Sequence, residues 1–140
     1  MSNEEPVNFE HEKAAVTEFW RNGYVRTFMD KDVEGFADHF ALPCLMRAEG
    51  LPRTVFTRRE ELVEYLREVI RIAHEAVWAR SGIDRFEVRI LDSDVAAVEV
   101  DAARFDSADR LTSRLYASYV LNKVDGEWKM VSVFGGFYPD

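Results

Sequence analysis

Three polar side chains stand among apolar residues at positions where each could serve the chemistry of a small-molecule site: Tyr24, His39 and Arg104. The Tyr24 hydroxyl could donate a hydrogen bond to a ligand oxygen, although a tyrosine in such surroundings is also an ordinary core residue. His39 could act as a base near neutral pH, or be a partly exposed histidine at a helix end. Arg104 could hold a carboxylate or enolate oxygen, or lay its stem over the core with its head in water.

Further residues are predicted to face the same interior and to line a pocket for an apolar ligand. They are Trp20, Met46, Tyr119, Met130, Ser132 and Phe134. The histidines are scattered and form no i, i+4 or H-x-H pair, so we expect no metal site. The sequence has no glycine-rich phosphate loop and no G-x-S-x-G elbow, and we expect no cofactor.

The first half of the chain contains the helices that must position these residues. Apolar residues recur at helical spacing between Glu10 and Met29, with Gly23 inside the stripe, where a bend or a close approach by another element would justify it. A short second helix is predicted from Asp32 to Phe40, before Pro43. Two short strands follow, the first beginning at Cys44 (residues 44–48) and the second around residues 53–56, and a T-x-x-E capping box at Thr57 opens a third helix.

The second half is predicted to form four strands in a meander, over about residues 85–91, 95–105, 112–123 and 127–134. Across the first loop, Arg85 and Glu87 are predicted to lie opposite Asp101 and Glu99 on the surface.

The last two strands are joined by Asp125-Gly126, a strong type I′ turn signal. A two-residue loop predicts four pairs: Lys123–Trp128, Leu121–Met130, Tyr119–Ser132 and Ala117–Phe134. The opposite face then carries a group that a second copy of the chain would cover, which predicts a homodimer. The group is Tyr116, Ser118, Val120, Val131 and Val133.

Length and charge limit the class of protein. The 140 residues fit one domain, 1–140, and 47% of them are hydrophobic, enough for one well-filled core. The formal net charge of −8 opposes binding to nucleic acid or to anionic membranes. No apolar run approaches the roughly 18 residues of a spanning helix, and the acidic N-terminus has no signal-peptide pattern, so we expect a cytoplasmic protein.

The order of elements resembles the nuclear transport factor 2-like superfamily, and within it the SnoaL-like and ketosteroid-isomerase-like group. The resemblance rests on "FADHFALP", on "TRREEL" at the third helix, and on the closing "YVLNKVDGEWKMVSVF" hairpin. It implies an α+β fold: a cone-shaped, strongly bent, mostly antiparallel sheet wrapped around three N-terminal helices. It also implies an interior cavity, and commonly a dimer through the outer sheet face.

The resemblance leaves the activity open. It implies a small-molecule-binding pocket protein of the SnoaL-like type, or an acid–base isomerase, cyclase or dehydratase acting on an apolar carbonyl-containing ligand. Tyr24 falls where the isomerases place a tyrosine as an oxyanion donor. Catalytic members use carboxylates buried in the cavity, whereas the predicted inner strand positions here carry no Asp or Glu. The alternative is a non-enzymatic, dimeric interaction module with a filled core.

Overall fold

The computed structural model describes residues 6–48, 50–75 and 79–139. Its helical segments are α1 (Phe9–Glu18), η1 (Phe19–Tyr24), α2 (Val25–Met29), α3 (Val33–Ala37) and α4 (Arg59–Glu75). Its strands are β1 (Phe40–Arg47), β2 (Thr54–Phe56), β3 (Arg80–Ile90), β4 (Val95–Phe105), β5 (Leu111–Val124) and β6 (Glu127–Phe137). These elements confirm the predicted α+β class, with helices leading and a meander closing the chain.

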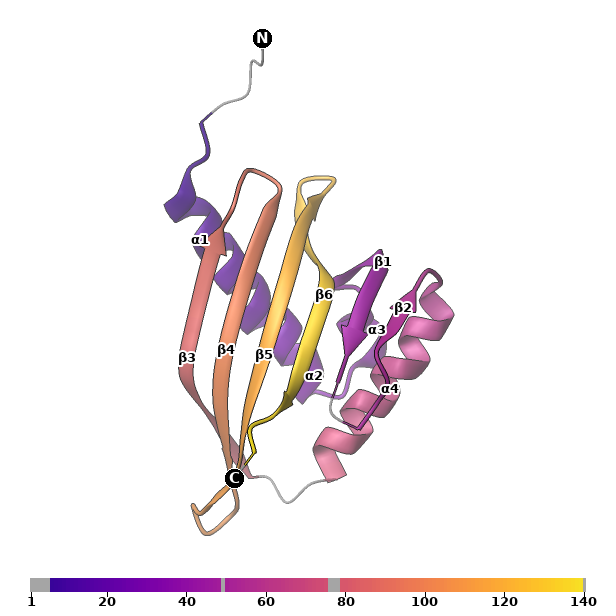
Figure 1. Cartoon of the computed structure of the whole chain (residues 1–140), viewed down its shortest axis with the longest axis vertical. Helices are drawn as coiled ribbons and strands as arrows, with labels where there is room; N and C mark the ends of the chain where they lie inside the picture. Colours follow the sequence, from indigo (N-terminus) through magenta and orange to yellow (C-terminus); the bar gives the residue numbers. More distant parts are fainter. Residues whose placement is uncertain (1–5, 49, 76–78, 140) are drawn as a thin grey trace.

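The strands form one curled, six-stranded sheet with the order β2-β1-β6-β5-β4-β3. All neighbours are antiparallel except β1 and β6, which run parallel. Figure 1 shows α1 crossing one face of the long strands while α4 lies beside β1 and β2. The other face of β3 to β6, turned toward the viewer, carries no helix among the described residues. The helices therefore cover one face of the sheet and leave the other open.

The first helical path is interrupted where the sequence places Gly23. Phe19–Tyr24 forms a π-helical turn, and a π-turn inside an α-helix commonly marks a functional or strained position. A Cβ atom added at Gly23 would lie 2.5 Å from His39 Nε2, so the glycine is needed for the close approach of His39. The His39 ring also packs against Phe19, with centroids 5.2 Å apart. The close approach by another element, one of the two expected reasons for the glycine, is thus present.

The second helix and the strand after it differ from the prediction at their boundary. The helix ends at Ala37, and β1 begins at Phe40 rather than at Cys44. The pairing of β1 with β6 shifts between Phe40 and Leu45, so the "FALP" segment is an irregular part of a strand. Tertiary pairing with β6 overrides the helical spacing of Phe36 and Phe40.

Strand pairing confirms part of the predicted register. Glu87 lies opposite Glu99, and Arg85 opposite Asp101. In the closing hairpin, Lys123 pairs with Trp128 and Leu121 with Met130, also as predicted.

Beyond Met130 the predicted register of this hairpin is wrong. Val120 pairs with Ser132, Tyr119 with Val133 and Ala117 with Gly135, because Val131 is an extra residue in β6. Such a bulge reverses the side-chain alternation of the strand that follows. Val133 is therefore buried on the inner face, whereas Ser132 and Phe134 follow the outer alternation.

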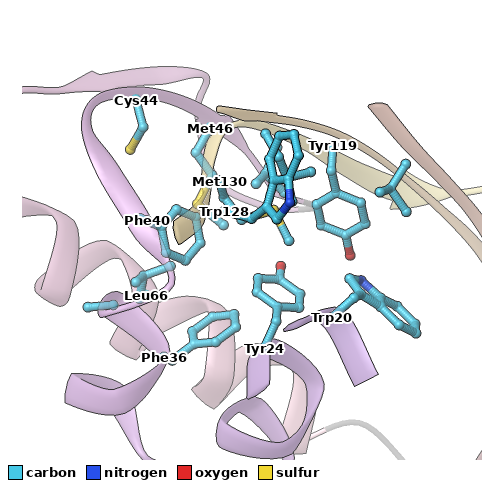
Figure 2. Packing of buried hydrophobic residues seen from close by; sticks show 14 of the residues in the cluster. Trp20, Tyr24, Phe36, Phe40, Cys44, Met46, Leu66, Tyr119, Trp128 and Met130 are labelled. Atoms are coloured by element: carbon cyan, nitrogen blue, oxygen red, sulfur yellow. The ribbon is translucent and has the colours of Figure 1, made fainter. Parts of the chain in front are cut away.

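The buried core lies between the helices and the inner sheet face (Figure 2). Aromatic residues from η1, α3 and β1 meet apolar residues from the central strands there. The fully buried side chains include Phe36, Leu66, Leu121 and Met130.

We predict that Gly23→Ala destabilises the protein, although alanine favours a helix over glycine by about 1 kcal/mol. The new methyl group would displace His39, whose Nδ1 donates a hydrogen bond to the Gly35 carbonyl 2.8 Å away. We expect a loss of about 1–3 kcal/mol, the range for overpacking, measured by urea denaturation.

The control for this prediction is the same substitution in a His39→Ala background. There the methyl group meets no imidazole, and Gly23→Ala should be neutral or stabilising. Equal losses in the two backgrounds would show that His39 is not the cause.

Candidate functional site

A cavity of about 290 Å³ lies between the helices and the inner face of the sheet. Its wall combines apolar side chains, two arginines and the two buried tyrosines Tyr24 and Tyr119. Tyr24 comes from η1, and the other elements that contribute are α2, α4, β1, β4, β5 and β6. The lining residues are Tyr24, Phe28, Met46, Arg47, Ala48, Val69, Ile72, Ala73, Arg104, Leu115, Tyr116, Ala117, Tyr119, Val133, Gly135, Gly136 and Phe137. A concave, mostly apolar space with a few polar groups is the usual form of a small-molecule site.

Small residues keep this space open. Ala117 on β5 pairs with Gly135 on β6, so neither strand projects a large side chain at that level. The next residue, Gly136, has no room for a side chain, because an added Cβ would lie 2.6 Å from Tyr116 Oη and 2.8 Å from Arg47 Nη1. The wall at the end of β6 is therefore formed largely by backbone.

Two tyrosines form the main polar group of the cavity wall. Tyr24 and Tyr119 have exposed fractions of 8% and 7%, and their ring centroids lie 5.4 Å apart, edge to face. Figure 2 shows their hydroxyl groups pointing toward one another. Two neutral phenols in this arrangement can share a hydrogen bond and still offer a proton or a lone pair to a third group.

Burial keeps both phenols neutral. It raises the pKa of Tyr24 well above that of an exposed tyrosine, and the neighbouring Tyr119, to which Tyr24 donates a hydrogen bond, raises it further. The pKa of Tyr119 is also raised by burial, an effect reduced by the Trp20 indole N–H and the Tyr24 hydroxyl. At neutral pH both groups are hydrogen-bond donors rather than bases.

Trp20 adds a buried donor beside this pair. Its ring centroid lies 6.5 Å from that of Tyr119, and in Figure 2 its nitrogen faces the tyrosine hydroxyls. Within the described part of the chain, Nε1 makes no hydrogen bond of normal geometry. A buried N–H without a good partner is costly, so this region has spare donor capacity.

The charged residues of the cavity wall are both arginines. Arg47 Nη1 donates a hydrogen bond to the Gly135 carbonyl, 2.8 Å away, and so fixes the end of β6. The Arg104 guanidinium carbon lies 5.8 Å from the centre of the Phe137 ring, and burial lowers the pKa of this arginine. An arginine remains charged in spite of such a shift.

The structure brings together some of the residues predicted from the sequence. Tyr24, Met46, Arg104 and Tyr119 line the cavity, whereas Trp20 and Met130 are buried in the core beside it. The predicted inner-face positions of Ser132 and Phe134 are wrong because of the bulge at Val131, and neither lines the cavity.

His39 also lies apart from the cavity wall. Its Nδ1 is held by the Gly35 carbonyl and its Nε2 faces Gly23, so the ring locks α3 against the π-turn. The structure supports this packing role: His39 is not a lining residue, and its ring packs edge to face on Tyr24, with centroids 6.5 Å apart.

Several lining residues were missed in the sequence. Val69, Ile72 and Ala73 lie on α4, which the sequence identified only as an amphipathic helix, and Arg47 and Val133 were assigned to no pocket. The Gly135-Gly136 pair was the available signal, because two glycines in a strand mark a close backbone approach or an open space.

Residues 6–48, 50–75 and 79–139 contain no group of three or more His, Cys, Asp or Glu side chains able to hold a metal ion. None of the helices there is long and apolar enough to cross a membrane. Cys44 is buried, which raises the pKa of its thiol to about 11.

The sheet is curled but does not form a barrel, and the helices cover its inner face around a cavity. This arrangement is typical of the cystatin-like α+β class, which includes the nuclear transport factor 2-like folds. The profile of one family, described as NTF2-like protein (DUF6841), matches residues 11–136. The chain belongs to this family, and the resemblance seen in the sequence is confirmed. No curated protein matches the sequence.

Solved structures agree with this fold at low identity. A ketosteroid isomerase-like protein from Erwinia carotovora atroseptica is 19% identical, with a TM-score of 0.66 over 91% of this chain and 94% of that chain. A protein of unknown function with a cystatin-like fold from Nostoc punctiforme is 16% identical, with a TM-score of 0.69 over 98% and 97%. The hexachlorocyclohexane dehydrochlorinase LinA-type3 from Novosphingobium barchaimii is 11% identical, with a TM-score of 0.68 over 94% and 89%.

The tyrosine pair predicts a specific dependence of stability on alkaline pH. Because the pKa of each tyrosine is raised in the folded state, the folded protein keeps both protons at a pH where the unfolded chain releases them. Stability is therefore complete below about pH 10 and falls as the pH rises above it.

Replacing both residues, Tyr24→Phe with Tyr119→Phe, should flatten this dependence. We expect the slope of the unfolding free energy against pH above pH 10 to decrease by up to about 1.4 kcal/mol per pH unit for each tyrosine. Urea denaturation across this pH range measures the slope. Identical slopes in wild type and the double variant would refute the assignment.

Proposed function

We propose that the protein binds a small, largely apolar molecule that carries a carbonyl oxygen, and that the cavity between the helices and the sheet is its site. Support comes from the volume of about 290 Å³, from the apolar wall, and from the small number of polar groups on it. A module with a filled core, the alternative considered for the sequence, would not require this space.

The observation that carries the proposal is the buried pair of neutral phenols. Whichever hydroxyl of the facing pair donates to the other, one phenolic proton stays available for a further acceptor. A ligand oxygen in the cavity is such an acceptor, and in a poorly solvated site its hydrogen bond is stronger than in water. A carbonyl group fits because it accepts hydrogen bonds and tolerates an apolar body beside it.

The proposal is limited to binding. The described lining residues offer hydroxyl donors and guanidinium cations, and none of them is Asp or Glu. Isomerase, cyclase or dehydratase chemistry would need a group that accepts a proton from the ligand, and neutral phenols are poor bases at neutral pH. The isomerase-like and dehydrochlorinase relatives share the fold, and fold alone does not transfer a reaction.

We predict that Ala117→Leu abolishes binding by filling the cavity. Ala117 lines the space opposite Gly135, so a larger side chain there would project into it. A library of small carbonyl compounds can be screened by thermal shift, since a ligand of the folded state raises Tm. Compounds that stabilise wild type should leave Ala117→Leu unchanged.

Ala97→Leu is the matched control for this test. Ala97 lies on β4 between the buried Ala96 and Val98, so it faces the outer side of the same sheet. The same substitution there should leave ligand binding intact. Hits that stabilise Ala117→Leu as strongly as Ala97→Leu would place the binding site elsewhere.

We also propose that a second copy of the chain covers the outer face of β5 and β6. Val120, with an exposed fraction of 39%, lies on this face next to Ser132, and Phe134 is half-buried on it. A sheet face with apolar side chains and no covering helix among the described residues suits an interface between identical subunits. Val133, first assigned to this face, is buried inside and takes no part.

Sedimentation should show a homodimer at micromolar concentration, and Val120→Asp should dissociate it. The substitution would bury an unpaired charge at the centre of the proposed interface. Val124→Asp serves as the control, because Val124 is also exposed but lies next to the hairpin turn. A monomeric wild type, or a dimer indifferent to Val120→Asp, would exclude this interface.

A further inference from the structure

We infer that the cavity selects a monoanionic ligand: a small apolar carboxylate whose carboxylate group lies on Arg104. This inference rests on the proposed binding function and adds the charge of the ligand to it.

Charge is separated across the sheet. The protein carries a formal net charge of −8, yet the charged side chains among the described lining residues are Arg47 and Arg104. Acidic residues of the neighbouring strands face the other side, where Arg85 contacts Asp101 at 2.8 Å and Glu87 at 3.1 Å. Arg104 therefore places a basic group on the inner side of the sheet in an acidic protein, which favours an anion there.

Arg104 is partly desolvated in the folded protein. Burial lowers the pKa of this residue, which means that the interior disfavours its charged form relative to water. A carboxylate placed beside the guanidinium would offset this cost through charge-assisted hydrogen bonds, which are stronger than those of a neutral amide. The planar guanidinium also matches the two oxygens of a carboxylate.

The rest of the cavity is small and mostly apolar. Its volume of about 290 Å³ is near the lower end of the range for small-molecule sites, which suits a small ligand. Phe137 and Leu115 supply apolar surface at the Arg104 end of the cavity, and Val69 and Ile72 supply it from α4. Phenylacetate combines a negative charge with the small apolar body that this wall suits.

The test compares phenylacetate with phenylacetamide, its neutral isostere, by isothermal titration calorimetry. We expect wild type to bind the carboxylate about 10- to 100-fold more tightly, the range for a hydrogen bond to a charged group. Arg104→Met should remove this preference and leave the weaker affinity for the amide unchanged. Acetate should bind far more weakly than phenylacetate, because it lacks the apolar body.

Arg114→Met is the matched control. Arg114 is exposed on the adjacent strand, where it contacts Asp84 at 3.3 Å, and it does not line the cavity. This variant should keep the full preference for phenylacetate. If Arg104→Met folds poorly, Arg104→Lys is the second variant, because lysine keeps the positive charge but lacks the planar guanidinium. Arg104→Lys should weaken phenylacetate binding more than Arg114→Lys does.

The remaining outcomes overturn the inference. Equal affinity for the carboxylate and the amide would refute the anion preference but leave the cavity as the binding site. Acetate binding as tightly as phenylacetate would indicate an adventitious ion only. Absence of phenylacetate binding at millimolar concentration would also refute it, whereas the proposed binding function stands or falls with the carbonyl library and Ala117→Leu.

Discussion

The candidate site depends on one irregularity of the sheet, the extra residue Val131 in β6. Without it, regular alternation would continue from Met130 and place Phe134 opposite Ala117 on the inner face. The bulge instead buries Val133 and sets Gly135 opposite Ala117. A phenyl ring is thereby replaced by a position with no side chain, which opens the space that the cavity occupies. Bulges are common where a sheet bends or turns a side chain toward a site, and this one does both for β6.

The two ends of the interior are used differently. Toward the hairpin turn the core is filled, and Lys123 Nζ contacts Glu12 Oε2 at 2.5 Å while lying 5.1 Å from the centre of the Trp128 ring. This largely buried ion pair ties α1 to the hairpin, and removing one partner alone would leave a charge without compensation. Toward the other end, Ala117 and Gly135 leave the interior open. The tyrosine pair lies at the boundary, where dense packing can fix the hydroxyls and the space beyond can receive a ligand.

The sequence predicted the class of fold well and the candidate site only in part. Helical periodicity, the Asp125-Gly126 turn and alternation in β4 are local signals, and they placed Tyr24, Tyr119 and Arg104 on the inner side. A bulge leaves no comparable local signal, because Val131 is as suited to a regular strand as to a bulged one. The error at Ser132 and Phe134 followed from that. The contribution of α4 to the wall depends on how the helix packs across the sheet, which its own periodicity cannot specify.

The features that define the cavity all work against stability. An apolar space of this size gives up the packing that a larger side chain at position 117 or 135 would supply. Arg104 loses hydration on burial, and the Trp20 indole lacks a hydrogen bond of normal geometry within the described part of the chain. In a chain of 140 residues, whose net stability is expected to be only about 5–15 kcal/mol, such costs together are substantial. Departures from good packing are expected where a site has a function, and their concentration around one cavity distinguishes it from the filled core beside it.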